Sequence, residues 1–486
     1  MAKECILEVR DEVNVRFNGL DVATRRKLVD KLKFFLPHAR HTPAFRLGRW
    51  DGTVSFCDIG GRTYINLITD LIPIIQQSGY TVEIDDRRVQ YEFDFDEIDK
   101  DSYSHVTWPA GHPMAGQPIE LREHQVEMVN SYLGTIQSIN VCPTAGGKTV
   151  VCAILSDRVA QYGKSVVIVP SKDLVTQTED DYINFGLDVG VYFGDRKDLS
   201  HKHTICTWQS LEALVKKTKD GTATVDINEF LEDVICVMVD EVHKSKAAVL
   251  RKLLSGPFAH VPMRWGLTGT LPQEDHEKVA VTSCIGPAIN SIKASELQAK
   301  GYLANLEIEM WQMKDFNDIF DNYQSELKWL TSNRKRIETI GDMVIGVTEE
   351  NGNTLILVDR IETGKLFNEF IPNSVFIDGS VKSSSRKEEY KSIQDVDGKI
   401  IIATYGVAST GISINRLFNL VLFEPGKSFI RVIQSIGRGL RVAEDKDFVN
   451  VYDVSSTCKY SKRHLAKRKK HYKDAEFPFK LKKVEY

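Results

Sequence analysis

The sequence predicts an α/β fold with two tandem parallel-sheet domains after a small α+β domain. Two observations carry this prediction. Short apolar segments alternate with helix-length segments from about residue 117 onward, and the pattern starts again after a pause near residues 285–310. The 486 residues also exceed one ordinary core and suit about three domains. We divide the chain into residues 1–108, 109–295 and 296–455, with a basic C-terminal tail at 456–486.

The composition is that of a globular protein, with 42% hydrophobic and 27% charged residues. No run of about 18 apolar residues exists, and acidic residues occupy the N-terminal stretch where a signal peptide needs an apolar core. We therefore expect a soluble, cytoplasmic protein. Eight cysteines stand far apart without a CxxC pair, so buried, reduced thiols are expected and a structural metal is not.

The net charge of −4 argues against general nucleic-acid affinity, but it is an average over unlike regions, so local patches matter more. The clearest basic patch is the tail, where eleven lysines and arginines from Lys459 to Lys483 face three acids. Such a run is typical of a solvated, flexible tail, and it also suits a nucleic-acid arm or a docking segment.

The N-terminal domain shows strand and helix periodicities in turn. Residues 5–19 alternate like a strand pair, and 22–35 have an amphipathic helical period. Residues 45–58 predict a hairpin that turns at Asp51-Gly52, a dipeptide suited to a type I′ turn. A helix at 65–79 and a strand at 80–86 follow, and the acidic run 92–101 is interpreted as a linker.

Basic and aromatic side chains gather around the predicted hairpin. Arg46, Arg49 and Arg62 could hold phosphates, while Trp50 could stack on a base. The alternative is that Trp50 anchors the core and the arginines are only solvated.

The loop 141–149, with the sequence VCPTAGGKT, links a predicted strand to a predicted helix. Gly146 and Gly147 permit a tight turn whose N–H groups could surround phosphate oxygens at a helix N-terminus. Lys148 would reach the β- and γ-phosphates of ATP, and the Thr149 hydroxyl would hold Mg²⁺. Cys142 stands where the strict phosphate-loop pattern has glycine, so an ordinary glycine-rich turn is the alternative.

An apolar strand at 234–239 runs directly into Asp240 and Glu241. Asp240 would take part in the Mg²⁺ shell, and Glu241 would orient or deprotonate the attacking water. His243 lacks a metal-ligand partner at a useful spacing and is interpreted as a residue that couples the ATP site to its neighbours. Thr268 and Thr270 flank Gly269 at the end of another predicted strand.

Polar residues also end two other strands of this domain: Pro170 and Ser171 follow one, and Thr207, Trp208 and Gln209 follow the next. Hydroxyls, amides and backbone N–H groups at such positions suit a nucleic-acid backbone. Ordinary helix capping is the alternative interpretation.

The second parallel-sheet domain carries two further motifs. Thr404, Thr410 and Gly411 follow a buried strand, and Gln434, Arg438 and Arg441 form the string QxxxRxxR within QSIGRGLR. Arginines three residues apart share a helix face, and planar guanidinium groups can stabilise charge on a transferring phosphoryl group.

In this order, the motifs between about residues 119 and 441 resemble those of superfamily 2 DExH helicases. The resemblance implies two RecA-like domains with ATP between them. It implies that Arg122 and Gln125 read adenine, and that Thr268 and Thr270 relay between ATP and nucleic acid. The implied nucleotide-binding residues are Arg122, Gln125, Thr144, Ala145, Gly146, Gly147, Lys148, Thr149 and Gly411. The implied catalytic residues are Lys148, Asp240, Glu241, Gln434, Arg438 and Arg441.

A narrower likeness rests on RLGRWDG, CPTAGGKT, TWQS, ATYGVASTGIS and IGRGLR, which together resemble the phage UvsW-type branch-migration helicases. That group implies an ATP-driven DNA helicase that remodels branched DNA, including forks, Holliday junctions and R-loops, in phage replication, recombination or repair. A monomer in the host-cell cytoplasm is expected. An RNA helicase, a duplex translocase and an ATP-switched DNA-binding or annealing protein stay open as alternatives.

Overall fold

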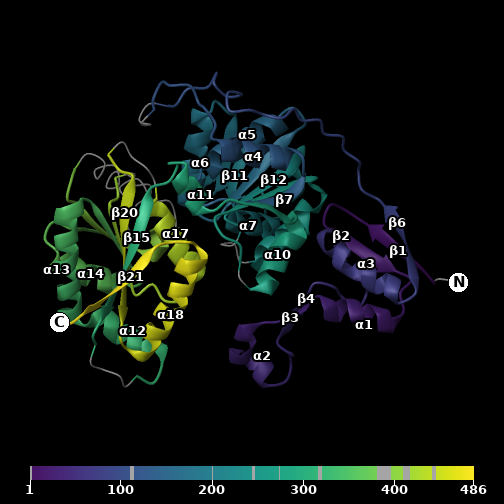
Figure 1. Cartoon of the computed structure of the whole chain (residues 1–486). Coiled ribbons are helices and arrows are strands. Elements are labelled where there is room, and N and C mark those ends of the chain that lie inside the picture. Colours follow the sequence, from purple (N-terminus) through teal and green to yellow (C-terminus); the bar gives the residue numbers. More distant parts are fainter. Residues whose placement is uncertain are drawn as a thin grey trace. The chain divides into compact units, whose positions relative to one another are not determined.

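The computed structural model describes residues 3–109, 114–199, 201–242, 247–272, 274–315, 320–379, 396–408, 416–440 and 445–486. These residues form two compact units (Figure 1). The first unit holds a small N-terminal sheet and an eight-stranded sheet, and the second holds a seven-stranded sheet. The predicted fold, two parallel-sheet domains after a small α+β domain, is confirmed.

The N-terminal domain is built on a four-stranded sheet in the order β5-β2-β1-β6. Its elements are β1 Lys3–Val9, β2 Asn14–Asn18, α1 Val22–Lys31, β3 Lys33–Phe35, η1 Pro37–His41, α2 Pro43–Arg46, β4 Thr53–Ser55, β5 Arg62–Tyr64, η2 Ile65–Leu67, α3 Ile68–Gln77 and β6 Tyr80–Asp86. Strand β1 pairs antiparallel with β2, as the alternation of residues 5–19 predicted, and parallel with β6.

The predicted hairpin at 45–58 is wrong. Strand β4 pairs with β3, so η1 and α2 lie in the connection between the two paired strands. Thr42 caps α2 and Pro43 begins it, which favours a helical turn where a strand was predicted. Asp51 instead accepts a hydrogen bond from the Thr53 N–H at 3.0 Å, and so shapes the entry to β4.

The N-terminal domain is joined to the first parallel-sheet domain by backbone and side-chain hydrogen bonds. The Glu12 N–H donates to the Ala259 carbonyl at 3.0 Å, and the Asn14 amide donates to the Ser255 carbonyl at 2.9 Å. Val13 is fully buried in the hydrophobic core of the parallel-sheet domain. The two domains of this unit therefore share a core.

The linker segment, residues 91–101, follows the surface of the first parallel-sheet domain. Phe93 and Phe95 each pack edge-on against the Tyr162 ring, with centroids 5.2 Å apart. The Tyr162 hydroxyl accepts from the Asp94 N–H at 2.8 Å and donates to the Asp94 carbonyl at 2.6 Å. The segment has no regular secondary structure but is held at fixed points.

The first parallel-sheet domain has the strand order β10-β9-β11-β8-β12-β13-β7-β14, in which only the β9–β10 pairing is antiparallel among the described strands. Its elements are α4 Glu123–Leu133, β7 Gln137–Val141, α5 Lys148–Val159, β8 Lys164–Val169, α6 Lys172–Asn184, β9 Val189–Phe193, β10 Arg196–Lys197, β11 His203–Thr207, α7 Trp208–Lys219, α8 Ile227–Phe230, β12 Val234–Asp240, α9 Ala247–Leu254, η3 Pro257–His260, β13 Met263–Thr268, α10 Asp275–Ile285 and β14 Ala288–Ser291. The apolar strands are buried on both faces, as expected for a parallel sheet.

The second parallel-sheet domain has the strand order β17-β18-β16-β19-β20-β15-β21. Its elements are α11 Ala294–Ala299, β15 Asn305–Met313, α12 Tyr323–Ser332, α13 Arg334–Asn351, β16 Thr354–Val358, α14 Ile361–Phe370, β17 Val375–Ile377, β18 Ile400–Thr404, α16 Tyr405–Ala408, β19 Asn419–Phe423, α17 Phe429–Gly439, β20 Phe448–Ser456, α18 Lys459–Asp474 and β21 Phe479–Val484. Strand β15 includes residues 310–313 and pairs in parallel with both β20 and β21.

The prediction of a flexible C-terminal tail is also wrong. Helix α18 packs on the second domain, and β21 pairs in parallel with β15 along Ile308–Met313. Among the eleven cations assigned to the tail, Arg468 is fully buried. The last segment of the chain is therefore part of the second sheet domain.

All eight cysteines are among the described residues, are buried and form no disulfide, and the predicted burial is confirmed. Burial raises the pKa of the Cys57 thiol to about 12. Within the described ranges, no helix is long and apolar enough to cross a membrane.

Candidate functional site

Three of the predicted motifs follow strands that are neighbours in the first parallel sheet. Strands β12, β13 and β7 are adjacent and parallel, with Asp240 opposite Leu267 and Thr268 opposite Val141. Their carboxyl ends therefore lie at one edge of the sheet, where open α/β sheets bind ligands. The acidic pair, the threonine pair and the glycine-rich loop begin at this edge.

The glycine-rich loop folds back on itself between β7 and α5. The Gly146 N–H donates to the Pro143 carbonyl at 3.0 Å, and Ala145 and Gly147 have positive φ angles of 68° and 82°. The Lys148 ammonium donates to the Cys142 carbonyl at 3.1 Å and to the Pro143 carbonyl at 3.3 Å. The lysine side chain therefore folds back onto the carbonyl groups at the start of the loop.

Cys142, the departure from the strict phosphate-loop pattern, is fully buried beneath this loop. A Cβ atom built on Gly146 would lie 2.4 Å from the Cys142 sulfur and 3.1 Å from the Pro143 carbonyl oxygen. No side chain fits there, so the glycine is required by the buried sulfur below it. The substitution changes the packing under the loop and removes no phosphate-binding group.

The acidic pair lies at the end of β12. Glu241 is buried and adopts a left-handed backbone conformation with φ of 52°, which is strained for a non-glycine residue. Its N–H donates to the Asp240 carboxylate at 2.9 Å. The left-handed turn changes the direction of the chain directly after the strand, and both carboxyl groups belong to residues at the sheet edge.

The threonine pair forms a closed turn after β13. The Thr268 hydroxyl donates to the Thr270 carbonyl at 2.7 Å and accepts from the Thr270 N–H at 3.3 Å. The Thr270 hydroxyl is buried and finds no hydrogen-bond partner within the described residues. A buried hydroxyl without a hydrogen-bond partner is uncommon in folded proteins.

Gln125 and Arg122 form the start of α4. The Gln125 side-chain oxygen accepts from the Arg122 N–H at 2.9 Å, and the Gln125 N–H donates to the Arg122 carbonyl at 2.8 Å. Gln125 is only 5% exposed, so its amide has a fixed orientation. Adenine recognition by this pair stays a prediction.

Tyr132 links two strands of the first parallel sheet and belongs to none of the sequence motifs described above. Its hydroxyl donates to the Gly266 carbonyl of β13 and accepts from the Asn140 N–H of β7, so it bridges the two strands below the site. The signal in the sequence is its spacing of seven residues from Gln125, which places both on one face of α4. That face is buried.

The hydroxyls predicted to contact nucleic acid serve as helix caps. Ser171 accepts from the Leu174 N–H and caps α6, and Thr207 accepts from the Ser210 N–H and caps α7. The capping alternative is therefore correct for both hydroxyls in this structure. Gln209 is exposed and Trp208 packs partly against the domain core, while Pro170 is partly exposed.

The second-domain motifs are described only in part. Thr404 ends β18, and its hydroxyl accepts from the Val407 N–H at 3.4 Å. Gln434 is buried on α17, the helix that also carries Arg438, whose side chain lies outside the described set. His243, Thr410, Gly411 and Arg441 likewise lie outside the described residues.

In the N-terminal domain, Arg49 is exposed and Trp50 is half-buried. The Trp50 indole N–H donates to the Thr53 carbonyl at 2.9 Å, which fixes the ring beside β4. This hydrogen bond fixes the orientation of the ring. Part of the Trp50 side chain is still exposed to solvent, and the preceding residue, Arg49, is exposed.

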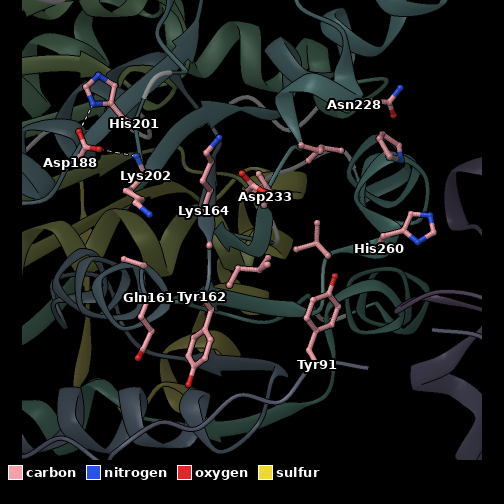
Figure 2. A pocket seen from close by; sticks show the side chains of 17 residues that line it. Tyr91, Gln161, Tyr162, Lys164, Asp188, His201, Lys202, Asn228, Asp233 and His260 are labelled. Carbon is pink, nitrogen blue, oxygen red and sulfur yellow. Dashed lines mark hydrogen bonds and ion pairs between the residues drawn. The ribbon is translucent and has the colours of Figure 1, made fainter. Parts of the chain in front are cut away.

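A cavity of about 850 Å³ lies at the other edge of the first parallel sheet, near the amino ends of β8 and β12. Figure 2 shows Tyr91, Lys164, His201 and Asp233 among the side chains that line it. His201 contacts both Asp188 and Asp198, and these hydrogen bonds raise its pKa. None of the predicted site residues lines this cavity, so the cavity is separate from the predicted ATP site.

Two regions of the chain match known protein families. Residues 118–273 match the family described as the res subunit of type III restriction enzymes, and residues 335–443 match the helicase conserved C-terminal domain. Together these matches place the chain among the superfamily 2 helicases, which confirms the resemblance found in its motifs.

The chain is similar to the ATP-dependent DNA helicase uvsW of Enterobacteria phage T4, with 26% identity over 92% of this chain and 90% of the relative. It is also 27% identical to the DNA 3'-5' translocase XPB2 of Sulfurisphaera tokodaii, over 47% of this chain and 49% of that protein. In fold, it is similar to Dbp5 of S. cerevisiae, with a TM-score of 0.51 at 12% identity, over 76% of this chain and 90% of that one.

Proposed function

We propose that the chain is an ATP-dependent DNA helicase that remodels branched DNA, such as forks, Holliday junctions and R-loops. One observation carries the proposal: the adjacent strands β7, β13 and β12 deliver the glycine-rich loop, the threonine turn and the acidic pair to a single sheet edge. The similarity to the phage T4 uvsW helicase along 92% of the chain supports DNA as the substrate.

In this proposal, the loop N–H groups and Lys148 bind the phosphates of ATP. The Thr149 hydroxyl and the Asp240 carboxylate are oxygen donors of the kind that Mg²⁺ prefers, so these residues fit the ion and would hold it. Bound Mg²⁺ would neutralise charge on the phosphates. Glu241 orients the attacking water and accepts its proton. Gln434, Arg438 and Arg441 keep their predicted roles in stabilising the transferring phosphoryl group.

The DNA contacts are proposed for residues at strand ends and in the N-terminal domain. Gln209, Thr404 and Arg49 present polar groups suited to the phosphate backbone, and Trp50 presents a partly accessible ring. The closed turn of Thr268 and Thr270, with His243, would couple these contacts to the nucleotide. The protein is proposed to act as a monomer.

The first experiment measures steady-state ATP hydrolysis without nucleic acid and with single-stranded DNA, duplex DNA, a four-way junction or RNA. We expect the junction to stimulate hydrolysis most. Equal or greater stimulation by RNA would favour an RNA helicase. An absence of stimulation by any nucleic acid would favour an ATP-switched binding or annealing protein.

A matched pair of substitutions tests the proposed general base. Glu241→Gln keeps the side-chain shape but cannot accept a proton, so we expect hydrolysis to fall roughly 10²-fold or more with nucleotide binding retained. Glu232→Gln, at an exposed position in the turn before the same strand, serves as the control and should keep wild-type activity. Unchanged hydrolysis in the Glu241→Gln variant would contradict the assignment.

The role of the N-terminal domain is better tested by point substitution than by deletion, because Val13 is part of the adjacent core. We expect Arg49→Ala with Trp50→Ala to reduce the preference for junctions over linear duplex. Arg26→Ala, at an exposed position on α1, is the control. An unchanged junction preference would remove these two residues from the proposed DNA site.

A further inference from the structure

Helix α18 is held rigidly on the second parallel-sheet domain. Its inner face is formed by Ser461, Leu465, Arg468, His471 and Tyr472, which are all buried. Leu465 and Tyr472 belong to the same hydrophobic core as the strands beneath them. The helix is therefore a fixed part of the domain surface.

Polar contacts add to this hold at both ends of α18. The Arg468 guanidinium donates to the Asp453 carboxylate at 2.7 and 2.8 Å, and neither side chain is exposed to solvent. The Tyr472 hydroxyl donates to the same carboxylate at 2.6 Å. At the start of the helix, the buried Glu326 carboxylate accepts from the backbone N–H groups of Tyr460 and Ser461.

The outer face of α18 is strongly basic. Six exposed cations lie on it: Lys459, Lys462, Arg463, Lys467, Lys470 and Lys473. Within the described residues none of the six forms an ion pair, and Asp474 is the single acid of the helix sequence. By contrast, Lys480 and Lys482 of the neighbouring β21 pair with acids of β15.

The spacing of these cations suits a phosphate backbone. Apart from the adjacent Lys462 and Arg463, they are three or four residues apart, and at 1.5 Å per residue the span from Lys459 to Lys473 is about 21 Å. Duplex DNA presents phosphates along each strand over that whole distance. Charge complementarity therefore favours a nucleic acid as the occupant of this face.

We propose that the outer face of α18 binds the phosphate backbone of duplex DNA. Single-strand sites combine positive charge with aromatic rings on which bases stack. On α18, Tyr472 is buried, and Tyr460 is half-buried and contacts the Tyr323 ring and the Lys459 ammonium, so no aromatic ring of this helix is fully exposed on the basic face. This inference rests on the proposed function and adds to it a duplex contact on the second domain.

The test compares two triple variants of the full chain. Lys462, Lys467 and Lys470 are changed to Gln on α18, and Lys216, Lys217 and Lys219 are changed to Gln on the exposed end of α7 as a control with the same charge change. Duplex affinity is measured without ATP over a range of salt concentrations. Unaltered urea midpoints for both variants establish that they fold.

We expect the α18 variant to bind duplex roughly tenfold more weakly at moderate salt, with the slope of log affinity against log salt reduced by about 3, one for each lost contact. Single-strand affinity should fall less. The control variant should match the wild type.

Two results would overturn the inference. One is an α18 variant with the same duplex affinity and salt slope as the control. The other is loss of polyglutamate binding without loss of duplex binding, which would indicate an acidic protein partner. A different result would contradict the proposed function: no form of DNA would stimulate ATP hydrolysis by the wild-type protein.

Discussion

The linker segment and helix α18 both carry many charged side chains, mainly acidic in the first and mainly basic in the second. The acidic run predicts a linker, and the basic run suits a solvated, flexible tail, a nucleic-acid arm or a docking segment. Both are held in place, but by different means. Aromatic rings fasten the linker segment at the surface around Tyr162, whereas a fully buried ion pair between Arg468 and Asp453 fastens α18 from below.

The comparison indicates that a charged segment is ordered when the side chains between its charged residues pack against the rest of the protein. In the linker segment, Tyr91, Phe93 and Phe95 alternate with acids, so every second side chain is available for packing. In α18, the anchoring residues recur at helical spacing, and one of them, Arg468, has the same charge as the exposed cations. A count of charges does not separate an anchoring arginine from a solvated one.

The largest expected effect comes from removing the buried cation. Arg468→Met leaves the Asp453 carboxylate buried without its partner, which costs about 3–5 kcal/mol in the free energy of unfolding. Lys467→Met, one residue earlier and exposed, should cost less than about 0.5 kcal/mol. Urea unfolding of both variants makes the comparison, and equal losses would show that α18 is not anchored through this pair.

The linker segment should be less costly to release. Tyr162→Ala removes two edge-on aromatic contacts and should cost about 2 kcal/mol, with faster proteolysis within residues 91–101. Tyr162→Phe keeps the ring and loses the hydrogen bonds to the Asp94 backbone, so a cost of about 1 kcal/mol is expected. If both variants resist protease as the wild type does, the aromatic contacts do not hold the segment.

Acid should weaken the packing of α18. Burial, together with the cations Arg468, Lys427 and Lys467, lowers the pKa of His464 to about 4. The unfolded chain therefore binds more protons between about pH 6.5 and 4, and stability falls as the pH falls through this window. Because His464 is partly exposed, we expect a loss of about 1 kcal/mol at pH 5 after allowance for solvent screening.

The check is a comparison of urea midpoints at pH 7 and pH 5 for the wild type and His464→Gln. The variant should lose less stability between the two pH values. An identical pH dependence in both proteins would remove His464 as the titrating group.

The smallest effect is expected for the acids of the linker segment. Glu92→Gln with Asp94→Asn and Asp96→Asn changes only exposed side chains, so stability should stay within about 0.5 kcal/mol of the wild type. Thermal or urea unfolding measures this directly. A loss as large as that of Tyr162→Ala would mean that the acids, rather than the rings, hold the segment.

Much of the fold could be predicted because buried parallel strands consist of short runs of mostly apolar residues, such as residues 165–169 and 234–239. The failures have local causes. Asp51-Gly52 is a good turn dipeptide, but Asp51 bonds to Thr53 and the partner strand lies at Lys33–Phe35, beyond the reach of a local pattern. Parallel pairing of β21 with β15 likewise leaves no trace in the neighbouring sequence.

At the site, the sequence motifs identified residues at one edge of the sheet, because a residue that directly follows a parallel strand lies at the carboxyl end of that strand. They did not predict how polar groups are used. Ser171 and Thr207 were candidates for DNA contact, but both hydroxyls cap helices, a role that any Ser or Thr at such a position can take. The strained backbone of Glu241 and the sulfur beneath Gly146 depend on three-dimensional packing.

The pairing of β21 with β15 has a consequence for the order in which the protein is made. Residue 313 ends β15, and its outer neighbour is not complete until residue 484 has been added. At about 5–20 residues per second, β15 leaves the ribosome roughly 10–30 s before that partner exists. During this interval the nascent chain carries an unpaired strand edge, which can pair with another chain and lead to aggregation until β21 has been made.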